Sequence, residues 1–320
     1  MKQQPRLNEM IKGQVFDGFL LTRAAAQKVS SNGGKYLDMT LCDISGEVNA
    51  KMWDGFTAPP NVADVLRVRG SMLEYNGRPQ LRVDKMRVAT EDDRYDMSEL
   101  APCAPESADV MRSRILSRVD AIADEQLRVL VRTRLERCGD ALDYYPAASK
   151  LHHAEKSGLL HHTDTMLTMA GHVCEVYPQL DADLLAAGVI LHDLCKLTEM
   201  NADGIGMVSD YTAEGMLIGH LVQGVAELDA LGKELGVSSE LLMMLEHMIL
   251  SHHDKPEFGS PKPPMFPEAE ALHTLDLLDA RMFEMTRELQ NALPGGFTER
   301  IWSLDNRRLY RRKESNERTE

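Results

Sequence analysis

The residues best suited to chemistry are His192, Asp193 and Lys196, which interrupt an otherwise apolar run at 184–197. Burying ionisable side chains in such a segment is costly unless something pairs with them. A divalent cation is a suitable partner, because neutral imidazole and carboxylate are both good ligands for it. All eleven histidines lie within residues 152–273. This part of the chain therefore looks like a metal-dependent hydrolase.

Further candidate ligands lie on both sides of the apolar run: His162, His220, His252, His253 and Asp276. The run predicts a helix over 181–198, on which His192 and Asp193 are about 100° apart and Lys196 follows within one turn. A carboxylate beside a histidine can bridge two cations, and two ions about 3.5–4 Å apart can activate water and hold a phosphate. Lys196 would then neutralise a phosphoryl oxygen or orient the hydroxide.

Charge is distributed unevenly along the 320 residues. Residues 1–90 hold 13 Lys and Arg against 9 Asp and Glu, a net charge of +4, whereas the whole chain carries −14 and the remainder therefore −18. A basic module attached to an acidic body is compatible with a polyanion that is bound at one end.

The pattern of hydrophobic residues changes near residue 100. Before it, alternating apolar residues predict about five short strands, which suit a small Greek-key barrel of the OB type; they lie at 14–21, 36–41, 47–53, 65–70 and 79–83. After it, amphipathic helices are expected at 107–138, 158–176, 181–198, 212–235, 238–252 and 268–292. The expected fold is multidomain, an all-β barrel followed by an all-α domain. The boundaries are 1–91 for the barrel, 92–106 for a linker, 107–306 for the helical domain and 307–320 for a charged tail.

Two family resemblances follow from these motifs. His162, His192-Asp193 and Asp276 resemble the ordered H…HD…D motif of the HD phosphohydrolase superfamily. The chain is also similar to YhaM-type 3′–5′ exoribonucleases, in which an OB domain precedes an HD domain. The stretches that carry this second resemblance are Gly158-Leu159-Leu160-His161-His162-Thr163, Leu191-His192-Asp193, Gly219-His220, Leu250-Ser251-His252-His253, Ala50-Lys51-Met52-Trp53-Asp54 and Gly296-Phe297-Thr298-Glu299-Arg300. The resemblance as a whole spans about residues 12–310.

The resemblance implies a ligand set for two ions. The first ion would be held by His162, His192, Asp193 and Asp276. The second would be held by His220, His252 and His253, with Asp193 bridging the two. Asp193 and Lys196 would be the catalytic residues.

Two departures from the family pattern affect this assignment. Cys195 stands where the motif has glycine, and His161 stands where an acidic residue commonly precedes the first ligand histidine. His161 is therefore an alternative to His162 as the first ligand. Asp279, one helical turn after Asp276, is an alternative to it as the last ligand.

The barrel supplies candidates for binding a nucleic-acid strand. OB barrels stack bases on exposed aromatic side chains while a basic groove follows the backbone. The candidates are Tyr36, Trp53, Lys51, Arg67, Arg69 and Arg82. The alternatives are that the aromatics fill the core of a small barrel, or that this domain contacts another subunit.

The resemblance implies a metal-dependent 3′–5′ exoribonuclease that hydrolyses single-stranded RNA, with single-stranded DNA as a second substrate. Two Mn²⁺ ions, or another first-row divalent cation, are expected because imidazole-rich sites select against Mg²⁺. One alternative is an HD phosphohydrolase of small nucleotides. Against its cyclic-dinucleotide branch, Asp254-Lys255-Pro256 follows His252-His253 where that branch has Gly-Tyr-Pro. A second alternative is a non-catalytic RNA-binding protein.

We predict a cytoplasmic location from the N-terminal sequence and the cysteines. The N-terminus has no apolar signal core, and the five cysteines form no CxxC pair, as expected for thiols in a reducing compartment. No segment has about 18 consecutive apolar residues, so we predict no transmembrane helix and no membrane partner. A homo-oligomer is compatible with the sequence.

Overall fold

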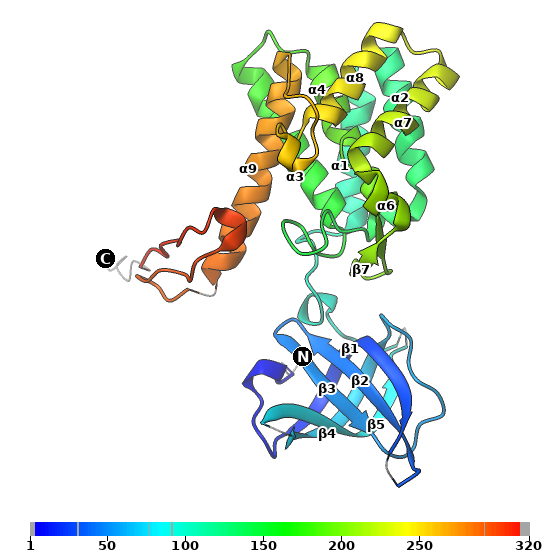
Figure 1. Ribbon diagram of the computed structural model, residues 1–320, viewed down its shortest axis with the longest axis vertical. Helices are drawn as coiled ribbons and strands as arrows, with labels where there is room; N and C mark the ends of the chain where they lie inside the picture. The colour runs from blue at the N-terminus through cyan, green and yellow to red at the C-terminus, as the bar shows by residue number, and fades with distance from the viewer. Residues whose placement is uncertain (1–3, 31, 76, 91, 291, 314–320) are drawn as a thin grey trace. The chain divides into compact units, whose positions relative to one another are not determined.

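The computed structural model describes residues 4–313 except residues 31, 76, 91 and 291. The chain forms two compact units that divide between Cys103 and Ala104. Figure 1 shows the first as a barrel and the second as a group of helices. Of the predicted tail, residues 314–320 lie outside the described residues.

The first unit is a closed barrel of five strands: β1 (Val15–Val29), β2 (Lys35–Asp43), β3 (Gly46–Met52), β4 (Val65–Tyr75) and β5 (Arg78–Val88). Their order is β1-β2-β3-β5-β4, and β1 closes the barrel by pairing antiparallel with both β2 and β4. Alternate residues point inward, so that Phe16, Leu20, Leu37 and Leu81 are fully buried. The predicted OB-type barrel is confirmed, although its strands extend beyond the predicted ends.

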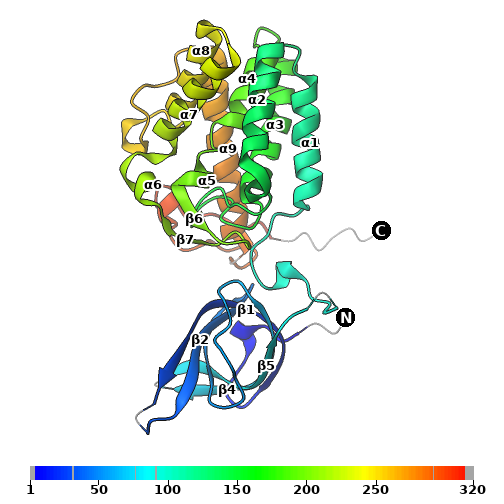
Figure 2. The same ribbon diagram turned by 90° about the vertical axis from the view of Figure 1, so that its right-hand side faces the viewer.

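The second unit is helical, as predicted. Its helices are α1 (Ala108–Ala121), α2 (Glu125–Cys138), α3 (Gly158–Val176), α4 (Ala182–Leu191), α5 (Lys196–Glu199), α6 (Ala213–Leu217), α7 (Gly219–Leu235), α8 (Ser239–Ser251) and α9 (Pro267–Gln290). A short hairpin, β6 (Met200–Ala202) and β7 (Val208–Tyr211), which the sequence did not predict, follows α5. The apolar helix α4 packs against α2, α3, α8 and α9 (Figure 2). It is therefore the centre of the core.

The helix predicted over 181–198 is wrong in one respect that matters for the site. Helix α4 ends at Leu191, residues 192–195 form a turn, and α5 begins at Lys196. His192 and Asp193 therefore lie in a turn rather than on a helix. The His192 ring satisfies the carbonyl of Val189 at 2.8 Å, so the side chain itself caps the end of α4.

The helix predicted over 212–235 is also divided. Helix α6 ends at Leu217, and α7 begins at Gly219, whose φ is 76°. A left-handed backbone at this position ends one helix and redirects the next, which glycine permits without steric cost. His220 is thereby placed in the first turn of α7.

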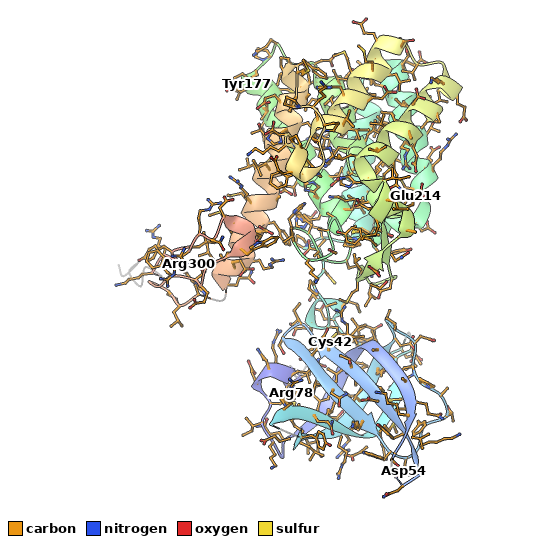
Figure 3. The ribbon with its side chains drawn as sticks, in the orientation of Figure 1. Cys42, Asp54, Arg78, Tyr177, Glu214 and Arg300 are labelled. Atoms are coloured by element: carbon orange, nitrogen blue, oxygen red, sulfur yellow. The ribbon has the colours of Figure 1, made fainter. Side chains whose placement is uncertain are left out.

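Residues 292–313 continue from α9 as two extended segments joined by the bridges Phe297↔Tyr310 and Ile301↔Arg307. Arg300 lies in this part of the chain (Figure 3). Over the described residues, none of the helices has the length and apolar content needed to cross a membrane.

Candidate metal centre

Two apolar helices end at the site in the same way. His192 follows α4 and its Nδ1 contacts the Val189 carbonyl oxygen at 2.8 Å; His252 follows α8 and its Nδ1 contacts the Ile249 carbonyl oxygen at 2.7 Å. A carbonyl oxygen only accepts hydrogen bonds, so each Nδ1 carries the proton and donates it. Each Nε2 is consequently left with a lone pair that can bind a metal.

Three further histidines are held through the same ring atom. Nδ1 of His162, on α3, lies 2.7 Å from Asp279, and Nδ1 of His220, on α7, lies 2.9 Å from Glu199. Nδ1 of His253 lies 2.8 Å from the carbonyl oxygen of Phe258. Such contacts orient the ring and are the usual second partner of a metal-binding histidine.

Asp193 lies between two groups of these histidines. Its Oδ2 is 3.3 Å from His192 Nε2 and 3.8 Å from His162 Nε2. Its Oδ1 is 3.5 Å from His220 Nε2 and 3.7 Å from His252 Nε2. The two carboxylate oxygens thus face different histidine groups, an arrangement that a bridging carboxylate requires.

The remaining predicted ligands join these groups. Asp276 Oδ1 lies 3.3 Å from His162 Nε2. Donor atoms of His220, His252 and His253 lie within 4.8 Å of one another, as do those of His162, His192 and Asp193. The structure therefore brings together all seven residues predicted as ligands.

The buried donor atoms of this cluster lack partners. Among the described residues, Nε2 of His162, His192, His220 and His252 and Oδ1 of Asp193 are buried without a hydrogen bond. Each unsatisfied buried polar atom costs about 1–3 kcal/mol. Four imidazole nitrogens and a carboxylate oxygen that converge in this way fit divalent cations, which would satisfy all five.

Electrostatics favour anionic carboxylates in the cluster. Burial raises the pKa of Asp193, but Lys196 and His192 outweigh it and hold this pKa well below its usual range. The Lys196 amine donates to Asp193 Oδ2 at 2.6 Å. Burial likewise opposes ionisation of Asp276, and His162 outweighs it, so that its pKa also lies well below the usual range.

The histidines differ in charge. Burial lowers the pKa of His162, but Asp276 and Asp279 outweigh it and raise the value to about 9. Burial lowers the pKa of His252 and of His253, with a further lowering from neighbouring histidines. Before any ion binds, His162 is therefore protonated at neutral pH, whereas His252 and His253 are neutral.

The structure adds partners that the sequence did not reveal. Glu199 orients His220, and Asp279 contacts Nδ1 of His162 instead of replacing Asp276. His152 lies near His162 and Asp276, and burial together with Lys196 lowers its pKa to about 3. The adjacent histidines His152 and His153, which precede α3, could have indicated from the sequence that His152 lies near the site. No neighbouring residues in the sequence indicated that Glu199 orients His220.

The alternative first ligand, His161, points elsewhere. Its Nδ1 lies 2.8 Å from Glu155 Oε1 and 3.1 Å from His153 Nδ1. His162, about 100° further round α3, faces Asp193 and Asp276.

On the barrel, part of the predicted nucleic-acid set gathers on β2 and β3. The rings of Tyr36 and Trp53 stack at 4.6 Å with an interplanar angle of 24°. The Lys51 amine lies 5.3 Å from the Tyr36 ring and 5.6 Å from that of Tyr75. Trp53 and Tyr75 are 45% and 60% exposed, and Arg82 pairs in register with Lys51. We call Tyr36, Lys51, Trp53 and Tyr75 the aromatic face.

Arg67 and Arg69 lie on β4, which pairs with β1. The Arg67 guanidinium lies 5.0 Å from the Phe19 ring and 2.5 Å from the Asp17 carboxylate. Arg69 stands opposite Asp17 in the β1–β4 register. The predicted basic residues thus lie on three neighbouring strands, β3, β5 and β4, and Asp17 partly neutralises Arg67.

Part of the helical unit matches a known protein family. Residues 159–281 match the HD domain family, and this segment contains all seven predicted ligands. The helical unit therefore contains an HD domain, which supports a metal-dependent phosphohydrolase.

The chain is also similar to the second OB-fold domain of replication protein A from Methanococcus maripaludis, with 15% identity over 29% of this chain and 100% of that chain and a TM-score of 0.23. A replication protein A heterotrimer bound to ssDNA matches with 15% identity over 28% of this chain and 72% of that chain and a TM-score of 0.22.

Proposed function

We propose that this protein is a metal-dependent phosphodiesterase that degrades single-stranded RNA as a 3′–5′ exoribonuclease, with single-stranded DNA as a second substrate. One observation carries the hydrolase part: the two oxygens of Asp193 face two histidine groups whose Nε2 atoms are otherwise unsatisfied. Two-metal phosphoesterases need this kind of shared carboxylate.

The ligands of the first ion would be His162, His192, Asp193 and Asp276, and those of the second His220, His252, His253 and Asp193. When bound, two such ions supply an activated water and neutralise charge on the phosphate. The Nδ1 contacts keep the imidazole rings oriented, so that little reorganisation is needed. Lys196 donates to Asp193 Oδ2 at 2.6 Å and would add a positive charge to neutralise a bound phosphate. The donor set, imidazole with carboxylate, favours Mn²⁺ or another first-row cation over Mg²⁺.

The substrate proposal rests on the aromatic face. Exposed, stacked rings offer flat apolar surfaces for bases, and the Lys51 amine between Tyr36 and Tyr75 offers a cation for the backbone. In OB barrels the face of the second and third strands is the usual binding surface. The 3′–5′ direction is supported by the resemblance to YhaM-type enzymes.

The test uses single-stranded RNA labelled at its 5′ end, incubated with the purified full chain and Mn²⁺. We expect a ladder of products that shorten from the 3′ end, no products with chelator, and no products from the His192→Ala variant. Internal cleavage from the first time points would contradict the exonuclease assignment. Intact RNA alongside turnover of small nucleotides would instead support the alternative phosphohydrolase.

A further inference from the structure

A second cluster of metal-binding side chains lies beside the HD site and shares none of its seven proposed ligands. It consists of His153 and Glu155, from the segment before α3, and His161 on α3. His153 Nδ1 lies 3.1 Å from His161 Nδ1 and 3.5 Å from Glu155 Oε1, and His161 Nδ1 lies 2.8 Å from the same oxygen. The side chains of His153 and Glu155 are 2% and 9% exposed, and that of His161 is 21% exposed.

The orientation of His153 is determined by its other ring nitrogen. Nε2 lies 2.7 Å from Asp279 Oδ2, so it donates its proton to that carboxylate, while the Phe283 ring packs 4.2 Å away. The lone pair of His153 Nδ1 is therefore directed at His161. In this arrangement a single proton, on His161 Nδ1, lies where the lone pairs of His153 and Glu155 converge.

We propose that His153, Glu155 and His161 form a further metal site, which binds Zn²⁺ or a similar divalent cation in place of that proton. Two histidines and one glutamate are an established zinc ligand set. Tetrahedral ligands about 2.0–2.1 Å from zinc lie about 3.3 Å from one another, close to the 2.8, 3.1 and 3.5 Å separations found here. The partly exposed edge of His161 leaves the remaining coordination position to water.

This site is connected to the HD site through one carboxylate. Asp279 Oδ2 lies 2.7 Å both from His153 Nε2 and from His162 Nδ1. It therefore orients one histidine of each site. An ion on His153 would make the position of Asp279, and through it that of His162, better defined.

The test counts ions. The full chain is equilibrated with Zn²⁺, dialysed into metal-free buffer and analysed by mass spectrometry for bound zinc per chain. We expect His161→Ala and Glu155→Gln to bind one ion fewer than the wild type. His172→Ala, an exposed histidine on the same helix, should bind as many as the wild type. Circular dichroism checks that each variant is folded.

A second measurement keeps the two sites apart. With Co²⁺ as the probe, the visible absorption bands lost in His161→Ala should persist in His252→Ala, which removes a ligand of the HD site. Equal zinc counts in folded His161→Ala and wild type would overturn the proposal and leave a proton shared by the three groups. Absence of RNA hydrolysis would refute the proposed function without altering the zinc count expected here.

Discussion

The HD site and the aromatic face differ in how strongly they indicate a ligand. In the HD site, buried Nε2 and Oδ1 atoms have no hydrogen-bond partner among the described residues. On the aromatic face, the side chains of Trp53 and Tyr75 are exposed, so water can form hydrogen bonds with their polar atoms. A buried unsatisfied site implies a specific missing partner, whereas an exposed face is stable without one. The assignment of metal to the helical unit is therefore the stronger of the two.

The largest effect should come from Asp193→Asn. This change keeps the shape of the side chain but removes the charge that both histidine groups face, so RNA hydrolysis should fall by about 10³-fold or more. The measurement is the initial rate on 5′-labelled RNA at saturating Mn²⁺. Asp229→Asn is the control, because Asp229 is an exposed carboxylate on α7 that pairs with Lys233. Comparable rates for the two variants would mean that Asp193 is not in the site.

Glu199→Gln tests whether the Glu199 carboxylate orients the His220 ring for metal binding. It weakens the contact to His220 Nδ1, and loss of such a contact typically lowers metal affinity by about 10–100-fold. Titration with Mn²⁺ measures the change. The matched control is Glu175→Gln, since Glu175 also pairs with a histidine, His172, but on the exposed end of α3. An effect of equal size in both variants would count against an orienting role for Glu199.

Trp53→Ala tests whether the aromatic face binds single-stranded RNA. Loss of one stacking platform should weaken binding of single-stranded RNA by about 1–3 kcal/mol, while hydrolysis of a small phosphodiester stays unchanged. Fluorescence anisotropy with a labelled oligonucleotide measures the affinity. Tyr177→Ala, an exposed aromatic on the helical unit (Figure 3), is the control and should not alter it. Unchanged RNA affinity in Trp53→Ala would remove the aromatic face from the proposal.

Metal affinity should depend on pH through His162. Its pKa of about 9 in the metal-free protein lies above the ordinary histidine value, so its imidazole is protonated at neutral pH. Metal binding must displace that proton, and affinity should fall by up to about tenfold for each pH unit below 9. Calorimetry in buffers of different ionisation enthalpy should show about one proton released at neutral pH from His162. An affinity that does not change with pH would show that His162 does not bind the ion.

Much of the fold could be predicted from the sequence, because alternating residues such as Phe16 and Leu20 distinguish the barrel from the helical unit. The order of the ligand histidines predicted which side chains would meet. The end of α4 could not be predicted, since the apolar run continues through Leu194 and Leu197 and the contact of the His192 ring with the Val189 carbonyl leaves no pattern in the sequence. The partnership of Glu199 with His220 depends on tertiary packing around the β6–β7 hairpin, which leaves no periodic trace in the sequence.

The most direct test of the central claim is an anomalous difference map from crystals of the full chain soaked in Mn²⁺. The account predicts two peaks about 3.5–4 Å apart, each in contact with one oxygen of Asp193, the first near His162 and the second near His220. A single peak that contacts only one histidine group, or peaks away from Asp193, would contradict a bridging carboxylate and with it the proposed two-metal site.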